Sequence, residues 1–454
     1  MPQNNPYLNR LPVTAPSQFY GRRADVERLL QNITAVEAPQ SVSVTGIRRI
    51  GKSSLLNFLR HSEGAREAFP EYFSTAYQLL FVPIDLSFPK PMRHPDDVSQ
   101  HSPVVEMMHR MLRRYGGKAF PQIEIARPPK TDDFAVQAEA LQTLFDQFED
   151  EDIRTVFLLD GFDAAGKIDK RFEDFLLLLT RHYQIAYIVS SMKPLHEMLE
   201  QGVDSLFGQI FTTQPLDMLS EADARDLLIE PAKDKGESWE DTLSEQLLAQ
   251  CGGHPDLLKL AGNHRWHLQR SHNAVPSLDA VLEAMRADAD ALFKSIFHHL
   301  VDGDSAAKSA LIALAHDRAL PRNGALVRTL KDYGGVIADA SGDLRLFSPL
   351  YKEWLQLYHS GKSGTDIRLE GRWITVGSKR EQLTETEMRL AQKLLTNRGQ
   401  TVKRDVLQEY VWGKVDPDSK ALDTTVQRLR AKIEEDRAHP QHLVTIRGEG
   451  YAMV

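Results

Sequence analysis

The chain has 454 residues, which is too long for one ordinary core and predicts two to four domains. A single cysteine, Cys251, excludes a disulfide framework and favours a reducing cytoplasm. No apolar stretch approaches the roughly 18 residues that a membrane helix needs, and the first residues do not follow the pattern of a signal sequence. We therefore expect a cytoplasmic protein with no membrane partner.

Charge is distributed unevenly along the chain. The whole sequence holds 55 Lys and Arg against 63 Asp and Glu, a net charge of −8. Residues 365–454 hold 16 basic and 14 acidic residues, so this end carries +2 and the rest carries −10. Such an asymmetry fits a small, basic-leaning module attached to an acidic body.

The first 215 residues alternate between predicted helices and predicted strands. Apolar residues at helical spacing predict helices at 22–33, 53–60, 104–115, 134–149 and 172–183. Short β-rich or apolar runs predict strands at 41–46, 79–87, 155–160 and 185–191. Prolines recur through residues 88–129, which we interpret as an insertion or mobile loop around one helix. The alternation favours a mainly parallel sheet with crossover helices.

Strand signals fade after about residue 215. Helical patterns near 220–232, 241–251, 255–270 and 277–298 predict an all-α lid. Residues 300–360 combine helices with the segment "GGVIADASGDLRLFS", which predicts a β-hairpin. The polar segment "HSGKSGTD" at 359–366 is typical of a linker.

The segment "GIRRIGKSS", which begins at Gly46, matches the phosphate-loop pattern G-x-x-x-x-G-K-[ST]. Gly46 and Gly51 allow the backbone N–H groups to face phosphates, Lys52 can reach the outer phosphates, and Ser53 can bind Mg²⁺. A strand before the loop and a helix after it have the order that this motif requires. The pattern predicts that the protein binds ATP or ADP with Mg²⁺.

The strand at 155–160 ends on Asp160, where a carboxylate would hold Mg²⁺ through water. Many ATPases place a second acid directly after it, but here Gly161 follows. Asp163 could take the role of that acid or could cap the following helix, and Asp85 could supplement the site or be structural; both questions stay open. With Lys52, Asp160 and Asp163 as the candidate catalytic residues, we expect tight nucleotide binding and, if any, slow hydrolysis.

Residues 5–360 resemble the signal-transduction ATPases with numerous domains, the STAND branch of the AAA+ superfamily, close to the origin-recognition ATPases. "FYGRRADVERLL" (19–30) resembles the family's N-terminal box, "GGHP" (252–255) its lid motif, and "LFSPLYKEWLQLY" (346–358) the end of a small winged helix. The nucleotide-binding residues that the motif and the resemblance imply are Tyr20, Gly21, Arg22, Gly46, Gly51, Lys52, Ser53, Ser54 and Pro255.

The sequence departs from this family at two places. Gly161 stands where members often carry a second acid, and "VSSMKP" lacks the arginine that many members place after the fourth strand. Ser190, Ser191 and Lys193 occupy that region instead. Both departures point to slow turnover.

The C-terminal end carries a helix with two different faces. Between 421 and 435, one face is apolar at Leu422, Val426, Leu429 and Ile433, and the other carries short polar residues and a cation, as suits a helix in a DNA major groove. Gln427 could read adenine, and Arg428 could read guanine or bind phosphate. The candidate DNA-binding residues are Lys403, Arg404, Thr424, Thr425, Gln427, Arg428, Lys432 and, in the wing "TIRGEGYAMV", Arg447. Arg430 falls near the buried edge and should contact the backbone or an acid.

Residues 367–454 resemble the winged-helix effector domain of OmpR/PhoB-type response regulators. Three blocks in order carry the resemblance, namely "LTETEMRLAQKLLTNRGQTVKRDVLQEYVWG", "ALDTTVQRLRAKIEE" and "TIRGEGYAMV". The fold class we expect is an α/β P-loop NTPase with a helical lid and a winged helix, plus a C-terminal α+β winged helix-turn-helix domain. The expected boundaries are 1–215 for the nucleotide-binding domain, 216–298 for the lid, 299–360 for the internal winged helix, 361–366 for the linker and 367–454 for the DNA reader.

These expectations combine into a transcriptional regulator whose DNA binding is controlled by nucleotide. Two alternatives stay open. One is an AAA+ ATPase that loads on or remodels DNA and forms nucleotide-dependent homo-oligomers. The other is a defence or signalling scaffold whose C-terminal winged helix binds an unknown protein partner.

Overall fold

The computed structural model describes residues 5–8, 11–35, 37–73, 77–87, 102–131, 133–165, 170–199, 202–301, 305–318, 324–333, 335–338, 342–359, 367–376, 379–397, 401–416, 419–434, 440, 442–446 and 450–453. The chain divides into two compact units. The first comprises residues 1–308 and 322–349, and the second comprises residues 309–321 and 350–454. In the described residues no helix is long and apolar enough to cross a membrane.

A five-stranded parallel sheet forms the centre of the first unit, in the order β2-β3-β4-β1-β5. The strands are β1 (Ser41–Thr45), β2 (Gln78–Asp85), β3 (Ile153–Asp160), β4 (Ala186–Ser190) and β5 (Phe211–Pro215). The expected parallel sheet is thus confirmed, but β5 was not predicted. Its sequence, FTTQP, buries only Gln214, so it has no apolar periodicity to reveal it.

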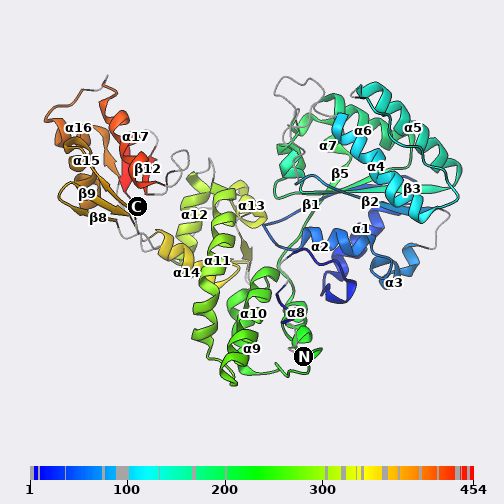
Figure 1. Cartoon of the computed structure of the whole chain (residues 1–454), viewed down its shortest axis with the longest axis horizontal. Helices are drawn as coiled ribbons and strands as arrows, with labels where there is room; N and C mark the ends of the chain where they lie inside the picture. The colour runs from blue at the N-terminus through cyan, green and yellow to red at the C-terminus, as the bar shows by residue number, and fades with distance from the viewer. Residues whose placement is uncertain are drawn as a thin grey trace. The chain divides into compact units, whose positions relative to one another are not determined.

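Helices cover both faces of this sheet (Figure 1). One face carries α4 (Ser102–Ala119), α5 (Phe134–Asp150), α6 (Lys170–His182) and α7 (Leu206–Gln209), and the other carries α1 (Arg23–Ile33), α2 (Lys52–Arg60) and α3 (Ala65–Ala68). Phe157 and Tyr187 stack at 5.8 Å beneath α5 and α6. Helix α4 occupies part of the segment interpreted as an insertion; residues 88–101 lie outside the described residues.

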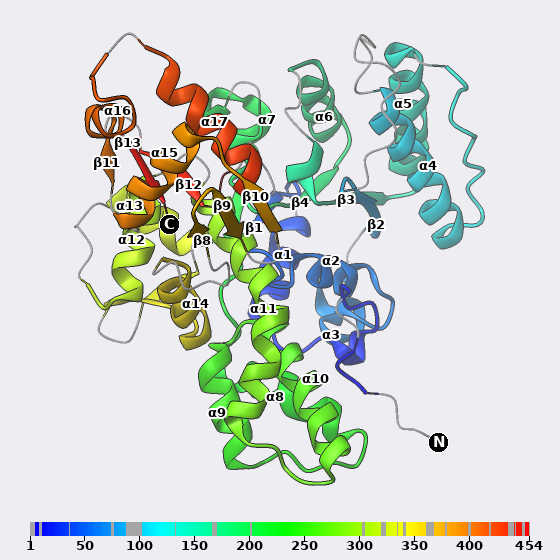
Figure 2. The same cartoon turned by 60° about the vertical axis from the view of Figure 1, so that its left-hand side comes forward.

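The expected helical lid is present (Figures 1 and 2). It consists of α8 (Glu221–Lys233), α9 (Thr242–Cys251), α10 (Pro255–His272) and α11 (Leu278–Val301). Trp239 lies at its centre under the Arg265 guanidinium, at 4.3 Å. Tyr7 stacks on Trp239 at 5.4 Å and donates a hydrogen bond to the Leu228 carbonyl. The N-terminal segment therefore packs against the lid.

After the lid come α12 (Ser305–Ala315), α13 (Gly324–Tyr333), a hairpin of β6 (Val336–Ala338) and β7 (Leu344–Leu346), and α14 (Pro349–His359). The hairpin confirms the prediction made from its sequence. The linker expected at 361–366 lies outside the described residues, and the domain boundaries stay predictions.

The C-terminal module is a winged helix, as expected. It begins with an antiparallel sheet of β8 (Ile367–Glu370), β9 (Trp373–Val376) and β10 (Lys379–Gln382), which the sequence reasoning did not single out. Then follow α15 (Glu385–Thr396), β11 (Val402–Lys403), α16 (Arg404–Trp412), α17 (Ala421–Ile433), β12 (Leu443–Ile446) and β13 (Gly450–Met453). The apolar stripe of α17 is at most 2% exposed, which confirms the predicted core face. Burying each such side chain contributes roughly 1.5–3 kcal/mol.

Candidate functional site

The phosphate loop connects β1 to the first turn of α2. Gly51 caps α2 with φ +110° and makes no side-chain hydrogen bond to the N–H groups of the first turn, and a Cβ on Gly51 would meet nothing within 4 Å. The Lys52 Nζ donates to the Gly46 carbonyl at 2.7 Å and the Ile47 carbonyl at 3.1 Å. A helix N-terminus with uncapped N–H groups, open space in front of it and a lysine alongside fits a bound phosphate chain.

Lys52 lies in an unusual electrostatic environment. Burial lowers the pKa of its ammonium group to about 8, although the carboxylates of Asp163 and Asp160 oppose the shift; the Arg48 charge adds to it. A cation whose solvation is already reduced would gain more from a phosphate than one in bulk water. The site therefore suits an anionic ligand.

Asp160 lies at the carboxyl end of β3, where the Ser190 hydroxyl at the end of β4 donates a hydrogen bond to its Oδ1. Strand β4 lies between β1 and β3, so the sheet brings Ser190 to the position between the phosphate loop and Asp160. Asp85 stands opposite Asp160 in register and accepts a hydrogen bond from the Ser87 N–H at 2.9 Å. Asp160 and Ser53 are the residues that would hold Mg²⁺.

Asp163 contacts the turn that follows β4, a partner that the sequence did not suggest. Its carboxylate accepts hydrogen bonds from the Met192 N–H, at 2.8 and 2.9 Å, and from the Lys193 N–H at 3.3 Å. It therefore holds the turn that follows β4. Next to Asp160, Gly161 has φ +69°, and a Cβ there would lie 3.0 Å from Ser87 Cβ. The local backbone thus disfavours an acid at the position where many ATPases have one.

The N-terminal box packs behind the phosphate loop. Arg22 is 8% exposed, adopts φ +61°, pairs with Asp25 at 3.3 Å and donates to the Ile50 carbonyl at 3.0 Å. Burial raises the pKa of the half-buried Tyr20 to about 12, and the charges of Asp234, Glu230 and Asp226 raise it further. Gly21 has φ +69°, and a Cβ there would overlap the Asp223 side chain. The box therefore joins the loop to α8, and its adenine contacts stay a prediction.

Ser54 has a protein partner that the sequence reasoning did not anticipate. Its Oγ accepts a hydrogen bond from the Val13 N–H at 3.0 Å, and Asn57 donates to the Val13 carbonyl at 3.0 Å. Phe19 stacks on Phe58 of the same helix at 4.5 Å. Ser54 therefore anchors the N-terminal segment to α2, and no signal in the motif pattern distinguishes this role from ligand binding.

The lid motif reaches the phosphate loop through two residues that the sequence reasoning missed. The His254 Nε2 lies 3.2 Å from the Arg48 carbonyl, and the Arg49 guanidinium pairs with Asp256 Oδ1 at 3.1 Å. His254 is fully buried, and burial lowers the pKa of its imidazole to about 4. Pro255, which the resemblance implies near the base, forms the first residue of α10. A histidine and an acid flanking this proline were the only available signal.

The same motif also packs against the segment before α14. A Cβ on Gly252 would lie 1.6 Å from the Phe347 carbonyl oxygen, so only glycine fits there. The His254 ring lies 5.4 Å from the Phe347 ring, and the Ser348 hydroxyl donates to the Gln250 carbonyl at 2.7 Å. His254 therefore contacts both the phosphate loop and the residues that precede α14.

In the C-terminal module, the outer face of α17 presents three of the predicted DNA-binding side chains to solvent. Thr424, Gln427 and Arg428 are exposed, as is Lys420 just before the helix. Thr425 is only 8% exposed, and its hydroxyl donates to the Ala421 carbonyl at 2.8 Å. Thr425 is therefore turned toward its own helix backbone.

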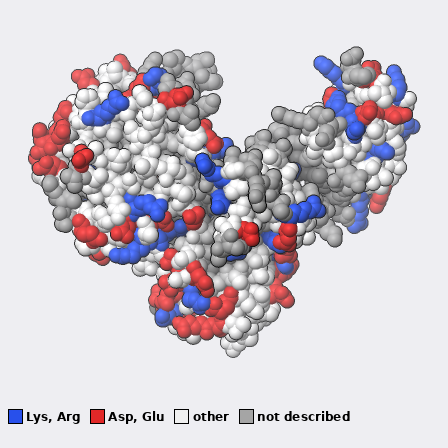
Figure 3. Space-filling model, turned by 180° about the vertical axis from the view of Figure 1, so that it is seen from behind, with Lys and Arg blue, Asp and Glu red and all other residues white. Residues whose placement is uncertain are grey.

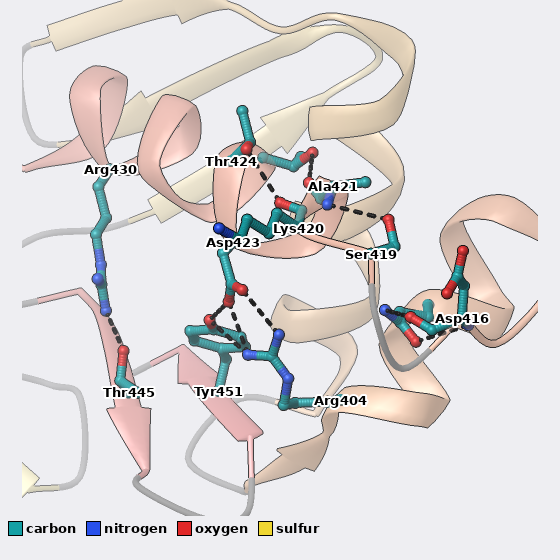
Figure 4. Close-up of polar contacts among 12 residues, drawn as sticks. Arg404, Asp416, Ser419, Lys420, Ala421, Asp423, Thr424, Arg430, Thr445 and Tyr451 are labelled. Atoms are coloured by element: carbon teal, nitrogen blue, oxygen red, sulfur yellow. Dashed lines mark hydrogen bonds and ion pairs between the residues drawn. The ribbon is translucent and has the colours of Figure 1, made fainter.

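Two other predicted DNA-binding cations have internal partners, and Figure 4 shows those of Arg404. Arg404 pairs with Asp423 of α17 at 2.7 and 2.9 Å and also donates to the Tyr451 hydroxyl at 3.0 Å. Lys432 donates to Glu387 at 2.6 Å and to the Gln382 carbonyl at 2.8 Å. Lys403 is exposed, and Arg447 lies outside the described residues.

Arg430 has the buried position expected from the helix pattern. Its guanidinium donates to the Leu443 carbonyl and to the Thr445 hydroxyl, each at 2.8 Å (Figure 4). The expectation that it contacts the backbone is confirmed. It ties α17 to β12 of the wing.

Two family models match the chain. The model described as Novel STAND NTPase 1 matches residues 8–318, and the model described as Transcriptional regulatory protein, C terminal, matches residues 378–453. The fold and the loop thus define a P-loop NTPase joined to an OmpR/PhoB-type winged helix. Because the first model covers more than half of the chain, the chain belongs to the Novel STAND NTPase 1 family.

Known proteins resemble different parts of the chain. Sensory transduction protein RegX3 of Mycolicibacterium smegmatis is 43% identical over 81 residues, which are 18% of this chain and 36% of that protein. RegX3 of Mycobacterium leprae is 46% identical over 89 residues, or 19% and 41%. The chain thus spans about two fifths of the length of these relatives. A Walker-type ATPase of Pyrococcus abyssi matches 77% of this chain and 99% of its own, at 14% identity and a TM-score of 0.51, which shows the fold alone.

Proposed function

We propose that this protein is a DNA-binding transcriptional regulator controlled by nucleotide. ATP or ADP binds with Mg²⁺ at the phosphate loop, the bound nucleotide sets the pose of the lid and of the segment before α14, and that pose frees or dimerises the C-terminal winged helix. The family membership and the phosphate loop support the first step. The family model over residues 378–453 and the exposed polar face of α17 support the last.

The observation that carries the control step is the position of His254. This buried side chain contacts the Arg48 carbonyl in the phosphate loop and the Phe347 ring next to α14. A shift of the loop on nucleotide binding would have to move a residue that packs against Phe347, because close-packed groups do not deform continuously. For the switch to go from mostly closed to mostly open, the nucleotide must bind one pose more tightly by several kcal/mol.

The proposed hydrolysis is slow because the described site offers no acid next to Asp160. Gly161 occupies that position, and the Asp163 carboxylate already accepts hydrogen bonds from two backbone N–H groups. Mg²⁺, when bound, would neutralise charge on the phosphates, with Ser53 and Asp160 as its protein partners. Rapid hydrolysis that disappears in Asp163→Asn, in protein that still binds nucleotide, would contradict this part of the proposal.

On the DNA side, α17 would enter the major groove with Gln427 and Arg428 toward base edges and Thr424 nearby. Lys403 and Lys420 would contact phosphates. On the face seen in Figure 3, lysine and arginine side chains stand out over the C-terminal module, and acidic side chains gather over the lid. Because Arg404 and Lys432 have internal partners, we expect fewer phosphate contacts and a correspondingly modest dependence of affinity on salt.

The test is DNA binding by the full chain to fragments of its own genomic neighbourhood, at fixed salt, without nucleotide, with ADP and with a non-hydrolysable ATP analogue. A sequence-preferring complex whose affinity changes with nucleotide supports the proposal. The variant His254→Ala should still bind nucleotide and DNA. The change in DNA affinity on nucleotide binding should be smaller, because the variant lacks the side chain that joins the phosphate loop to Phe347. Nucleotide-dependent large assemblies on any DNA would favour the loading ATPase, and loss of all DNA binding with nucleotide binding intact would favour a protein-binding module.

A further inference from the structure

Two consecutive arginines of the phosphate loop face different surroundings. Arg49 pairs with Asp256 of the lid, and its charge contributes to lowering the pKa of His254. Arg48 instead contributes to lowering the pKa of Lys52. The Arg49 side chain thus contacts the lid, whereas Arg48 belongs to the same loop as Lys52 and its charge acts on the Lys52 ammonium group.

The backbone that carries Arg48 is held on three sides. The Arg48 carbonyl lies 3.2 Å from the His254 Nε2. Arg49, the next residue, adopts φ +60°, and its side chain pairs with Asp256 of the lid. The Ile50 carbonyl accepts a hydrogen bond from Arg22. The Arg48 side chain is exposed, and within the described part of the chain it has no hydrogen bond or ion pair. A held backbone that carries an exposed cation, in the same loop as Lys52, is an arrangement that can bind an anion.

We propose that Arg48 is a γ-phosphate ligand, supplied by the phosphate loop itself, which makes the site prefer ATP to ADP. This inference rests on the proposed nucleotide binding. A guanidinium suits the role because its fork can bind two oxygens of one phosphoryl group. In this role Arg48 contacts only the γ-phosphate, which ATP has and ADP lacks, so it favours ATP over ADP.

The experiment compares the wild-type chain with Arg48→Ala, Arg48→Lys and the neighbouring control Arg49→Ala. Dissociation constants for Mg²⁺–ADP and for a Mg²⁺–non-hydrolysable ATP analogue are measured by calorimetry on each full-length protein. We expect Arg48→Ala to weaken the ATP analogue by roughly tenfold to hundredfold, as for loss of a hydrogen bond to a charged group, and ADP by less than about threefold. Arg48→Lys should recover part of the loss, since it keeps the charge without the fork.

Arg49→Ala separates this role from a general effect of removing charge from the loop. Its partner is Asp256 in the lid, so it should change the affinities for both nucleotides by a similar factor. An equal effect of Arg48→Ala on ADP and the ATP analogue, or no effect on either, would overturn the inference and leave the proposed function intact. A wild-type protein that binds neither nucleotide would overturn both.

Discussion

The phosphate loop and helix α17 differ in how much of their surroundings could be predicted from the sequence. Around the loop, residues from β1, β3, β4 and the lid converge, because the carboxyl ends of parallel strands meet at one edge of a sheet. On α17, the helix period separated the inner from the outer face, but two of the predicted cations nearby, Arg404 and Lys432, bond to acids of the same module. The motif predicted the loop between β1 and α2, whereas the helix period did not predict which partner a nearby basic residue would have.

The largest expected effect tests the loop. Lys52→Ala should weaken nucleotide binding by at least about a hundredfold, because it removes the cation that reaches the outer phosphates. Within the described residues this lysine bonds to the Gly46 and Ile47 carbonyls alone, so the variant should fold. Calorimetric titration with Mg²⁺–ADP measures the effect, and unchanged affinity would remove the loop from the proposed mechanism.

The second prediction concerns the contact between loop and lid. Burial keeps the pKa of His254 at about 4, below the ordinary value near 6.5, so the unfolded chain binds the extra proton first as the pH falls. The stability of the first unit should be complete above pH 6.5 and should fall by roughly 3 kcal/mol toward pH 4. Urea unfolding across this range measures it. In the variant His254→Gln, the free energy of unfolding should depend less on pH between 6.5 and 4. The same pH dependence in the variant and the wild-type protein would contradict the attribution of this effect to His254.

The third prediction tests the exposed face of α17. Arg428→Ala should cost about 1–3 kcal/mol of DNA-binding free energy and relax the preference for one base pair, because this exposed side chain can reach a base edge. A footprint with base substitutions at each position measures both quantities. A uniform loss across all sequences would reassign Arg428 to a phosphate.

The matched control for Arg428 is Lys432, one turn further along α17. Lys432→Ala should leave DNA affinity nearly unchanged and should lower stability by about 1–3 kcal/mol, because the Glu387 carboxylate, only 4% exposed, loses its charged partner. Chemical denaturation and DNA titration of the same preparation measure the two effects. Strong loss of DNA binding in a protein of unchanged stability would show that the internal bond opens on DNA.

The smallest effect is expected at Arg404. Its side chain and that of Asp423 are 43% and 45% exposed, so Arg404→Ala should cost only about 0.5–1 kcal/mol of stability. Arg404 holds the pKa of Asp423 below its ordinary value, so this contribution is present above about pH 4 and is lost as the pH falls further. Urea unfolding at pH 7 and pH 3 measures it. A salt dependence of DNA affinity that becomes shallower by about one unit would instead identify Arg404 as a phosphate contact.

The sequence by itself determined the elements whose signal is local. The phosphate-loop pattern, the helix periods of α1, α8 and α17 and the hairpin before α14 follow from residue spacing and turn residues, which act within a few positions of one another. The two family resemblances rest on the same kind of signal, since they depend on motifs that stand in order along the chain.

Only the tertiary structure decided which of these residues meet. The polar strand β5 forms because β1 offers it an edge, Ser54 bonds to Val13 across 41 positions, and His254 contacts a loop carbonyl 206 positions away. Asp163 contacts the turn after β4, and its position along the chain did not suggest this partner. The physical reason is that a hydrogen bond or ion pair depends on distance in space, and the folding of distant segments brings these partners within reach.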